Sequence, residues 1–291
     1  MILLYVLIGL LLLLLFFLVA KMGKRVHFVK SFLTFFIILC VLGFAFFIDN
    51  SSSWQMVQGV QTIKHWIKSP VVNTNTFLED KFHMSIIKLK DKVLIDAPAI
   101  NQFPELPRGC EVTSLAMLLQ HAGVNVDKNT LAKEIRKDST PYKVADGKIY
   151  FGNPHDGFVG DMYSFDNPGL GVYHEPIKDL AEKYLPGQIK DLTGSSFQEL
   201  RIHLSDDRPV WVVTNTAYKK LPQESFQTWN TPSGKVDITY KEHAVLLTGY
   251  DDDYIYFNDP LTGEKNKKAL LKDFEEAWEQ MGSQAITYHQ N

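Results

Sequence analysis

The chain has 291 residues, 45% of them hydrophobic and 22% charged, with a formal net charge of −3. Four of its basic residues and none of its acidic residues lie in the first 48 positions, so the remainder is mildly acidic. A nucleic-acid-binding surface needs a basic face, and we therefore expect no nucleic-acid partner. The two cysteines, Cys40 and Cys110, exclude a scaffold held together by several disulfides.

Two uncharged apolar runs open the chain, at residues 1–20 and 31–48. About 20 helical residues cross the roughly 30 Å hydrocarbon core of a bilayer, so each run predicts a transmembrane helix. The short segment between them holds all four basic residues, which the positive-inside rule puts in the cytoplasm. We expect a two-pass protein of the cell membrane, bound to the lipid bilayer through residues 1–48, with the rest extracytoplasmic.

Other interpretations of the N-terminus stay open. A signal peptide needs both a basic start and a small-x-small cleavage site. The first run lacks the basic start, and the second run has one but is followed by FAFFIDNSSS, which shows no such cleavage site. A single anchor behind an unusual signal is the remaining alternative. Residues 49–92 are expected to be a juxtamembrane connector, in which Trp54 to Ile67 form either an interfacial helix or a solvated stalk.

From Val93 to the C-terminus the pattern predicts one packed domain. Apolar residues at helical spacing follow Cys110, and Gly123 is a plausible stop for that helix. A second helix begins near Asp127 or Thr130. The spacing predicts two more helices, at Pro176 to Leu185, with proline in the first turn, and from the capping box of Ser196 and Glu199 to Leu204.

Strands come later in the chain. PVWVVT at residues 209–214, HAVLLTGY at 243–250 and YIYF at 254–257 are rich in β-branched and aromatic residues, and three aspartates at 251–253 form a turn. Helices first and strands later predict an α+β fold rather than a doubly wound sheet. The connection at 138–175 is long, and long connections are often functional, so we expect it, with Tyr163 and Tyr173, to wall a substrate cleft.

Cys110 and His243 are the first candidates for chemistry. Cys110 lies at the start of a helix, where the helix dipole lowers a thiol pKa and favours thiolate. His243 opens an apolar strand 133 residues later, so it can stand at a strand end facing a cleft. Papain-like enzymes separate these two residues by roughly 130–150 positions. We interpret Cys110 as a nucleophile and His243 as its general base.

Asp259 and Gln102 complete the candidate set. Asp259 ends the neighbouring strand, where a hairpin would return it to His243 and let it accept the Nδ1 hydrogen of the imidazole. Asn258 should point to the opposite face because side chains alternate along a strand. Gln102 precedes Cys110 by eight residues, and its amide could donate to an oxyanion beside the Cys110 backbone N–H.

The order glutamine, cysteine at a helix start, histidine on a strand and aspartate after the next strand is that of a papain-like site. QFPELPRGCEVTSLAMLL, HAVLLTGY and YFNDPLTG resemble the core motifs of papain-like peptidase family thirty-nine, the double-glycine, bacteriocin-processing peptidases, over about residues 95 to 285. The chain looks most like stand-alone bacterial relatives. The resemblance implies a papain-like fold, a helical lobe followed by an antiparallel sheet, and a cysteine peptidase acting on a peptide or protein.

The sequence also departs from that family. Glu111 follows the cysteine where transporter-borne members usually carry Gly or Ala, and its carboxylate would raise the thiol pKa unless it points away or caps the helix. No GxxxxGK[ST] motif for an ATPase is present. Two other functions stay open: a non-catalytic module on the same fold that binds peptides or a membrane partner, and a thiol acyl- or amidotransferase.

No metal site and no cofactor are expected. His155, Asp156 and Asp161 are close in sequence but lack HExxH or CxxC spacing. The histidines other than His243, including His121, His155, His174 and His203, we interpret as surface or core residues.

Overall fold

The computed structural model describes residues 89–289, which belong to one compact unit of the chain. The transmembrane helices expected at 1–48 and the connector up to residue 88 lie outside the described residues. Among residues 89–289, no helix is both long enough and apolar enough to cross a bilayer.

The helices carry local start and stop signals. They are α4 (Cys110–His121), α5 (Lys128–Glu134), α6 (His174–Tyr184), α7 (Phe197–Ser205) and α8 (Leu271–Gln280), with a 3-10 turn η1 at Gln223–Ser225. Asp127 caps α5 by accepting hydrogen bonds from the amides of Asn129 and Thr130, and Gly123 adopts a positive φ just beyond α4. The predicted start and stop of α4 and the predicted start of α5 are thereby confirmed.

The other predicted helices differ in detail. α6 begins at His174, two residues before the predicted start, although Pro176 still lies in its first turn, where a missing N–H costs nothing. Ser196 accepts the Glu199 amide hydrogen at the start of α7, which is one half of the predicted capping box. α8 was not predicted.

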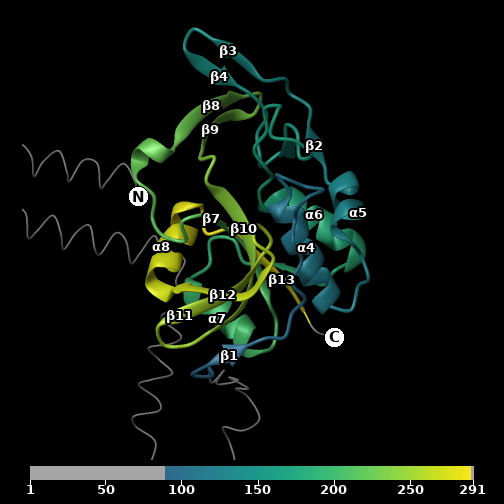
Figure 1. Cartoon of the computed structure of the whole chain (residues 1–291), viewed down its shortest axis with the longest axis vertical. Coiled ribbons are helices and arrows are strands. Elements are labelled where there is room, and N and C mark those ends of the chain that lie inside the picture. The colour runs from purple at the N-terminus through teal and green to yellow at the C-terminus, as the bar shows by residue number, and fades with distance from the viewer. Residues whose placement is uncertain (1–88, 290–291) are drawn as a thin grey trace, which may run out of the picture. The chain divides into compact units, whose positions relative to one another are not determined.

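An antiparallel sheet forms the centre of the domain (Figure 1). Its strand order is β12-β11-β10-β7-β13-β6, and β1 pairs with β10. The strands are β1 (Val93–Leu94), β6 (Ile189–Asp191), β7 (Val210–Asn215), β10 (Glu242–Tyr250), β11 (Tyr254–Asp259), β12 (Glu264–Leu270) and β13 (Ala285–Tyr288). The three predicted strands are β7, β10 and β11, and Asp251 closes the predicted turn by accepting the amides of Asp253 and Tyr254.

The long connection at 138–175 contributes short strands to two further sheets. β2 (Lys137–Asp138) pairs with β5 (Phe158–Val159), while β3 (Lys143–Ala145) and β4 (Lys148–Tyr150) join β8 (Gln227–Thr231) and β9 (Gly234–Ile238). Figure 1 shows this four-stranded sheet projecting beyond the end of β10. Its strands are short and largely polar, so their sequence carries little apolar alternation to predict them.

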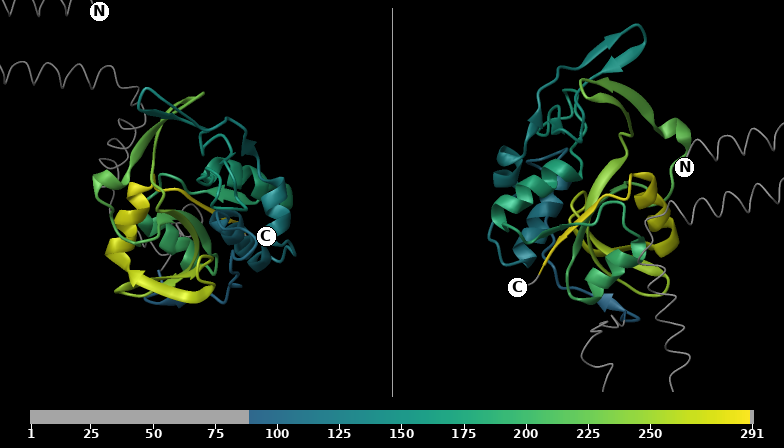
Figure 2. Two further views of the ribbon diagram at one scale, coloured as in Figure 1. Left: turned by 45° about the horizontal axis from the view of Figure 1, so that its top comes forward. Right: turned by 180° about the vertical axis from the view of Figure 1, so that it is seen from behind.

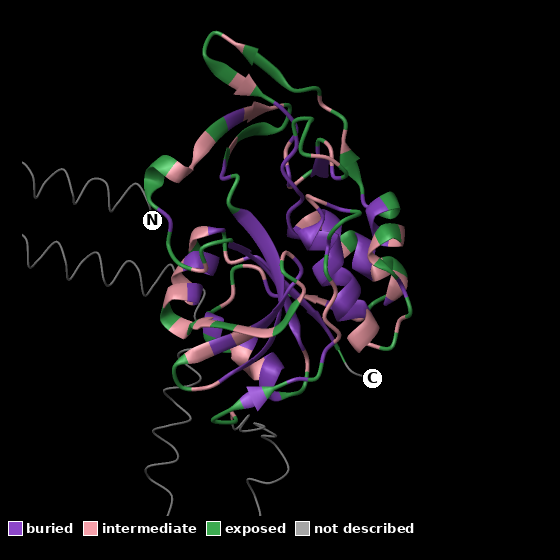
Figure 3. Ribbon diagram, viewed as in Figure 1, coloured by how far each residue is buried: buried purple, intermediate pink, exposed green. Residues whose placement is uncertain are grey.

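The core lies between the helices and the central sheet. Every residue of β7 and β10 is buried, as is every residue of α4 from Cys110 to Leu119 (Figure 3). α4 and α6 lie to one side of these strands and α8 to the other (Figure 2). The N-terminal end of α4 therefore meets the N-terminal end of β10 inside the fold.

Candidate functional site

Cys110 is the first residue of α4 and is 7% exposed. Gly109 before it makes no side-chain cap, and a Cβ there would lie 2.5 Å from the Cβ of Leu106, so the close turn into the helix requires glycine. The first backbone amides of α4 therefore donate no hydrogen bond to a side chain at position 109.

Ser114 fixes α4 against β10. One helical turn after Cys110, the Ser114 hydroxyl donates to the carbonyl oxygen of Ala244 at 3.1 Å. The backbone of Ala244 also contacts the Cys110 thiol, where its amide favours the thiolate. Because Ala244 directly follows His243, these contacts bring the nucleophile candidate to the start of the histidine strand.

The hydrogen-bond partner of the Cys110 thiol is Glu111. The sulfur donates to Oε2 of Glu111 at 3.3 Å, and Oε1 of the same carboxyl accepts the Val172 amide hydrogen at 2.7 Å. Burial raises the pKa of the Cys110 thiol well above its usual range, and the charges of Glu111 and Glu242 raise it further. The expected lowering of the thiol pKa by the helix dipole is therefore outweighed by burial and by Glu111, which points toward the sulfur instead of away from it.

Glu242 is a second buried carboxyl beside the thiol. The sulfur and one oxygen from each of Glu111 and Glu242 lie within 4.8 Å of one another. Burial raises the pKa of Glu111 to about 7, and burial with the Glu111 charge raises that of Glu242 well above its usual range. A Cβ on Gly171 would lie 1.9 Å from Glu111 and 3.0 Å from Glu242, so only glycine leaves room for the two carboxyl groups here.

His243 and Asp259 form a buried pair at the other side of the site. Nε2 of His243 lies 2.8 Å from Oδ1 of Asp259. The sequence prediction named Nδ1, so the nitrogen is corrected, while the pairing of the two residues is as expected. Asn258 instead binds the carbonyl oxygens of Ala97 and Pro98, as alternation along β11 predicts.

Asp259 is held by more donors than the histidine alone. Its oxygens accept hydrogen bonds from the Tyr218 hydroxyl at 2.9 Å, the Lys267 ammonium at 2.7 Å, and Leu261 and Thr262 in the following turn. Burial by itself would raise its pKa, but the hydrogen bonds and charges of His243 and Lys267 hold that pKa well below its usual range. Asp259 is thus a fixed carboxylate.

Tyr218 and Lys267 were not found by sequence reasoning. Tyr218 follows β7 with φ of +51°, an unusual backbone for tyrosine, and its ring lies 4.7 Å from that of Phe257. Lys267 lies on β12 with its ammonium 5.0 Å from the Tyr218 ring. The only sequence signal is that β12 follows the Asp259 turn, which puts Lys267 on the adjacent strand.

Gln102 is buried, with 2% exposure, in the loop before α4. Its amide nitrogen donates to the carbonyl oxygen of Pro107 at 2.7 Å, and its Oε1 has no hydrogen-bond partner. The backbone amide of Gln102 donates to the carbonyl oxygen of Pro260 at 2.8 Å, which joins this loop to the residue after Asp259. The side-chain amide nitrogen of glutamine carries two hydrogens, so one of them is not used by the hydrogen bond to Pro107.

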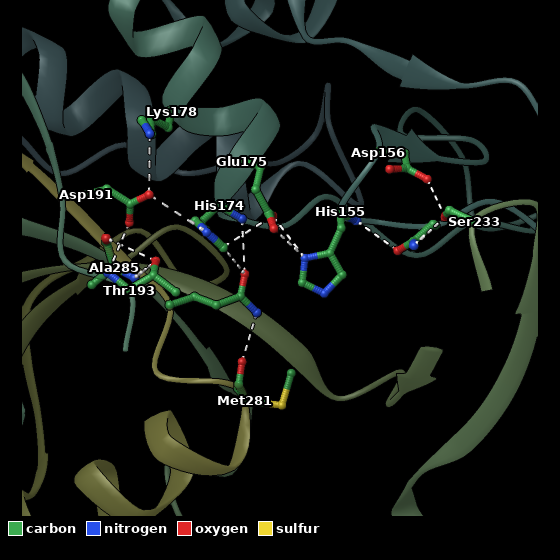
Figure 4. A network of polar contacts seen from close by, with 12 residues as sticks. His155, Asp156, His174, Glu175, Lys178, Asp191, Thr193, Ser233, Met281 and Ala285 are labelled. Atoms are coloured by element: carbon green, nitrogen blue, oxygen red, sulfur yellow. Dashed lines mark hydrogen bonds and ion pairs between the residues drawn. The ribbon is translucent and has the colours of Figure 1, made fainter. Parts of the chain in front are cut away.

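The four predicted residues therefore occupy connected elements. His243 contacts Asp259 directly, Gln102 is joined to the Asp259 turn, and Cys110 contacts the residue after His243. Within residues 89–289 no hydrogen bond joins the Cys110 sulfur to the His243 ring. Another set of ligand-type side chains, His155, His174 and Glu175, also lies together (Figure 4).

A pocket opens in the long connection at 138–175. Its volume is about 420 Å³, and its lining includes Tyr142, Phe151, Met162 and Tyr163. Arg108, two residues before Cys110, donates its amide hydrogen to the Met162 carbonyl at 3.0 Å and its guanidinium to the Asp161 carbonyl at 3.1 Å. Tyr173 does not line this pocket. It is buried, and this burial together with the charges of Glu242 and Glu111 raises its pKa.

The family model and the solved structure that the chain matches point to the same family. The family model described as Peptidase_C39 like family matches residues 94–286. The chain is 48% identical over 194 residues to the uncharacterized protein YvpB of Bacillus subtilis (strain 168), covering 66% of this chain and 74% of that protein. A crystal structure from Bacillus anthracis, described as a C39-like peptidase, superposes with a TM-score of 0.65 at 48% identity, covering 69% of this chain and 99% of the other.

The family match at residues 94–286 includes the helices α4 to α8, nearly all of the central sheet and the four candidate residues. The mixed helix-and-sheet fold is thus that of the C39-like peptidases. The chain belongs to the Peptidase_C39 like family.

Proposed function

We propose that the protein is a thiol-dependent hydrolase that cleaves peptide bonds with Cys110 as nucleophile, His243 as general base and Asp259 as the residue that orients the base. The observation that carries the proposal is the buried His243–Asp259 pair, 2.8 Å apart, at the start of the strand that α4 contacts through Ser114 and Cys110. The family supports a peptidase activity and hence a peptide or protein substrate.

The hydrogen bond to Asp259 assigns the two imidazole nitrogens. An ionised carboxylate only accepts, so Nε2 of His243 carries the hydrogen and Nδ1 is left with a lone pair. In the proposed reaction, Nδ1 removes the Cys110 proton, the thiolate attacks the amide carbonyl, and the imidazolium then protonates the leaving amine. Water hydrolyses the resulting thioester.

Two donors are available for the oxyanion. The amide of Cys110 lies at an α4 start that Gly109 does not cap, and the amide of Gln102 has one hydrogen beyond its Pro107 contact. The Gln102 side chain is buried, which fixes its position without help from solvent. Donors held in place before the reaction cost little reorganisation when charge develops.

In this conformation the Cys110 side chain is a protonated thiol and not the reactive thiolate. Its pKa is raised and its hydrogen goes to Glu111, so forming the thiolate requires transfer to His243. We propose that substrate binding displaces this contact. The pocket tied to Arg108 is the proposed site for the substrate side chain, as the long connection at 138–175 first indicated.

The membrane placement is also part of the proposal. The apolar runs at 1–48 and the basic segment between them support a bilayer anchor with the peptidase domain outside the cell. Substrates would then be peptides or proteins at the outer face of the membrane. The orientation is tested by adding a protease to intact cells that carry the protein with a C-terminal tag. Cleavage of the tag supports the orientation, and full protection of the tag contradicts it.

Thiol labelling tests the assignment of the nucleophile. The full-length protein is treated with iodoacetamide between pH 5 and 9, and the modified cysteine is identified by mass spectrometry. We expect Cys110 in the wild type to react faster than in His243→Ala, because the base withdraws the thiol proton. Equal rates in both proteins would contradict the role of His243.

A further inference from the structure

Three side chains of types that can bind a metal ion lie together outside the site around Cys110. His155 comes from the loop before β5, and His174 and Glu175 are the first two residues of α6. Nδ1 of His155 lies 2.8 and 2.9 Å from the two oxygens of Glu175, and Nδ1 of His174 lies 3.2 Å from Oε2 (Figure 4). One ligand atom from each residue lies within 4.8 Å of the other two.

This geometry is close to that of a zinc site. Zinc binds imidazole nitrogen and carboxylate oxygen at about 2.0–2.2 Å in a tetrahedron, which puts neighbouring ligand atoms roughly 3.3 Å apart. The nitrogen–oxygen separations of 2.8–3.2 Å would need to widen by a few tenths of an ångström. The ligand atoms of the two histidines lie within 4.8 Å of each other and would need to come no farther apart. Two histidines and one carboxylate with a fourth position for water are a ligand set that such ions prefer.

The residues behind the ligands favour the same conclusion. Nε2 of His174 faces Oδ2 of Asp191 at 3.9 Å, and Asp191 is itself fixed by the Thr193 amide and by Lys178. That separation is longer than a hydrogen bond, and a shift of about 1 Å would close it. A carboxylate bonded to the far nitrogen of a ligating histidine sets its tautomer and raises its basicity. The backbone amide of His174 also donates to Oε1 of Gln284 at 3.0 Å, which fixes the residue at the start of α6. Nδ1 of His174 lies 3.2 Å from the same oxygen, so a bound ion would replace that contact.

His155 is equally well positioned. Its backbone amide donates to Oδ1 of Asn153 at 3.1 Å, and its ring packs edge-on against Tyr173 with 4.7 Å between centroids. The next residue, Asp156, accepts the Ser233 hydroxyl, which fastens the loop to the turn between β8 and β9. A histidine with this much support loses little entropy when it binds a ligand.

The site is open on one side. The side chains of His155 and Glu175 are 40% and 42% exposed, whereas that of His174 is 11% exposed. An ion can therefore enter from solvent, and water can complete its coordination. The competing interpretation is a solvent-exposed ion pair between His155 and Glu175, which would bind no ion.

We propose that His155, His174 and Glu175 bind a divalent transition metal ion of the zinc class, with Asp191 orienting His174. The ion fastens the loop before β5 to the first turn of α6. Val172, whose amide binds Glu111, lies two residues before His174, so the ion also steadies the segment beside the thiol. This assignment departs from the sequence-based expectation of no metal site, which rested on the absence of HExxH or CxxC spacing.

The test is metal binding to full-length protein in neutral detergent after chelation and dialysis. Cys110→Ala serves as the parent, so that the thiol offers no additional ligand. Zn²⁺ titrated by calorimetry should bind at one site per chain and raise the melting temperature, and Co²⁺ should give the visible absorption of a four-coordinate ion. Either readout is independent of peptidase activity.

Variants of the parent locate the ion. His155→Gln and His174→Gln should each weaken zinc binding at least about 100-fold, and Asp191→Asn, behind the ligands, roughly 10–100-fold. His289→Gln, at the end of the described chain, is the matched control and should bind as the parent does. Undiminished binding in folded His155→Gln, or no binding to the parent, would overturn the proposal. Near-ultraviolet circular dichroism checks folding, and His155→Gln decides the matter if His174→Gln fails to fold.

Discussion

His243 and Asp259 are joined by a 2.8 Å hydrogen bond in the interior of the protein, where Asp259 is 1% exposed. Replacing Asp259 with asparagine leaves a similar shape but removes the charge that fixes the imidazole tautomer. We expect Asp259→Asn to lower the rate of peptide cleavage roughly 10²–10⁴-fold. Asp252→Asn, in the turn at the other end of the same hairpin, is the control and should retain the wild-type rate.

The same substitution has a pH-dependent effect on stability. The pKa of Asp259 is depressed in the folded state, so its ionised form stabilises the protein above the ordinary aspartate pKa of about 3.9, and this contribution is lost as the pH falls. Asp259→Asn should therefore cost roughly 3 kcal/mol at neutral pH and progressively less in acid. Denaturant melts at pH 7 and pH 3 measure the difference; an equal cost at both pH values would contradict it.

Glu111 controls the thiol through its charge. Its carboxyl accepts the Cys110 hydrogen, and its negative charge raises the thiol pKa. Glu111→Gln removes that charge and keeps an acceptor for the Val172 amide, so the pH profile of Cys110 alkylation should shift to lower pH. Glu224→Gln, a surface change, should leave the profile where it is. A shift to higher pH in Glu111→Gln would show that the carboxylate favours the thiolate instead.

We expect Tyr218 to hold Asp259 in position. Its hydroxyl donates to Oδ2 at 2.9 Å. Loss of one such bond costs about 0.5–1.5 kcal/mol, so Tyr218→Phe should slow cleavage roughly 3–10-fold. Tyr256→Phe breaks a comparable bond to Asp251 at 2.7 Å and provides the control. Equal rates for the two variants would remove Tyr218 from the site.

Gln102 is the proposed side-chain donor to the oxyanion. Removing one such donor lowers the turnover number roughly 10²–10³-fold, so Gln102→Ala should be impaired but still active. Because its amide also binds Pro107, the melting temperature is measured in parallel. Gln198→Ala on the exposed face of α7 is the control. Full activity in Gln102→Ala would assign the oxyanion to backbone amides alone.

Local signals explain why much of the fold could be predicted. Three of these signals each involve only a few residues: the apolar spacing after Cys110, the cap at Asp127 and the stop at Gly123. All three are present in the structure. Alternation along β11 is likewise local, and it correctly separates the side chains of Asn258 and Asp259. The short polar strands β3, β4, β8 and β9 depend on pairing between distant segments, which no local pattern encodes.

The site was less predictable than the fold for the same reason. Whether Glu111 points toward or away from Cys110 depends on the Val172 amide, which lies 61 positions along the chain. Tyr218 reaches Asp259 only through an unusual backbone conformation after β7, and Lys267 only through the pairing of β11 with β12. The helix-dipole argument failed for the thiol pKa because burial and two neighbouring carboxyls outweigh it.

A peptide-library digest asks whether Cys110 and His243 cleave peptide bonds. Full-length wild type, Cys110→Ala and His243→Ala are each incubated with the library, and new termini are identified by mass spectrometry. The wild type should produce new peptide termini, and neither variant should produce any above background. Cleavage by Cys110→Ala at the wild-type rate would show that Cys110 is not the nucleophile.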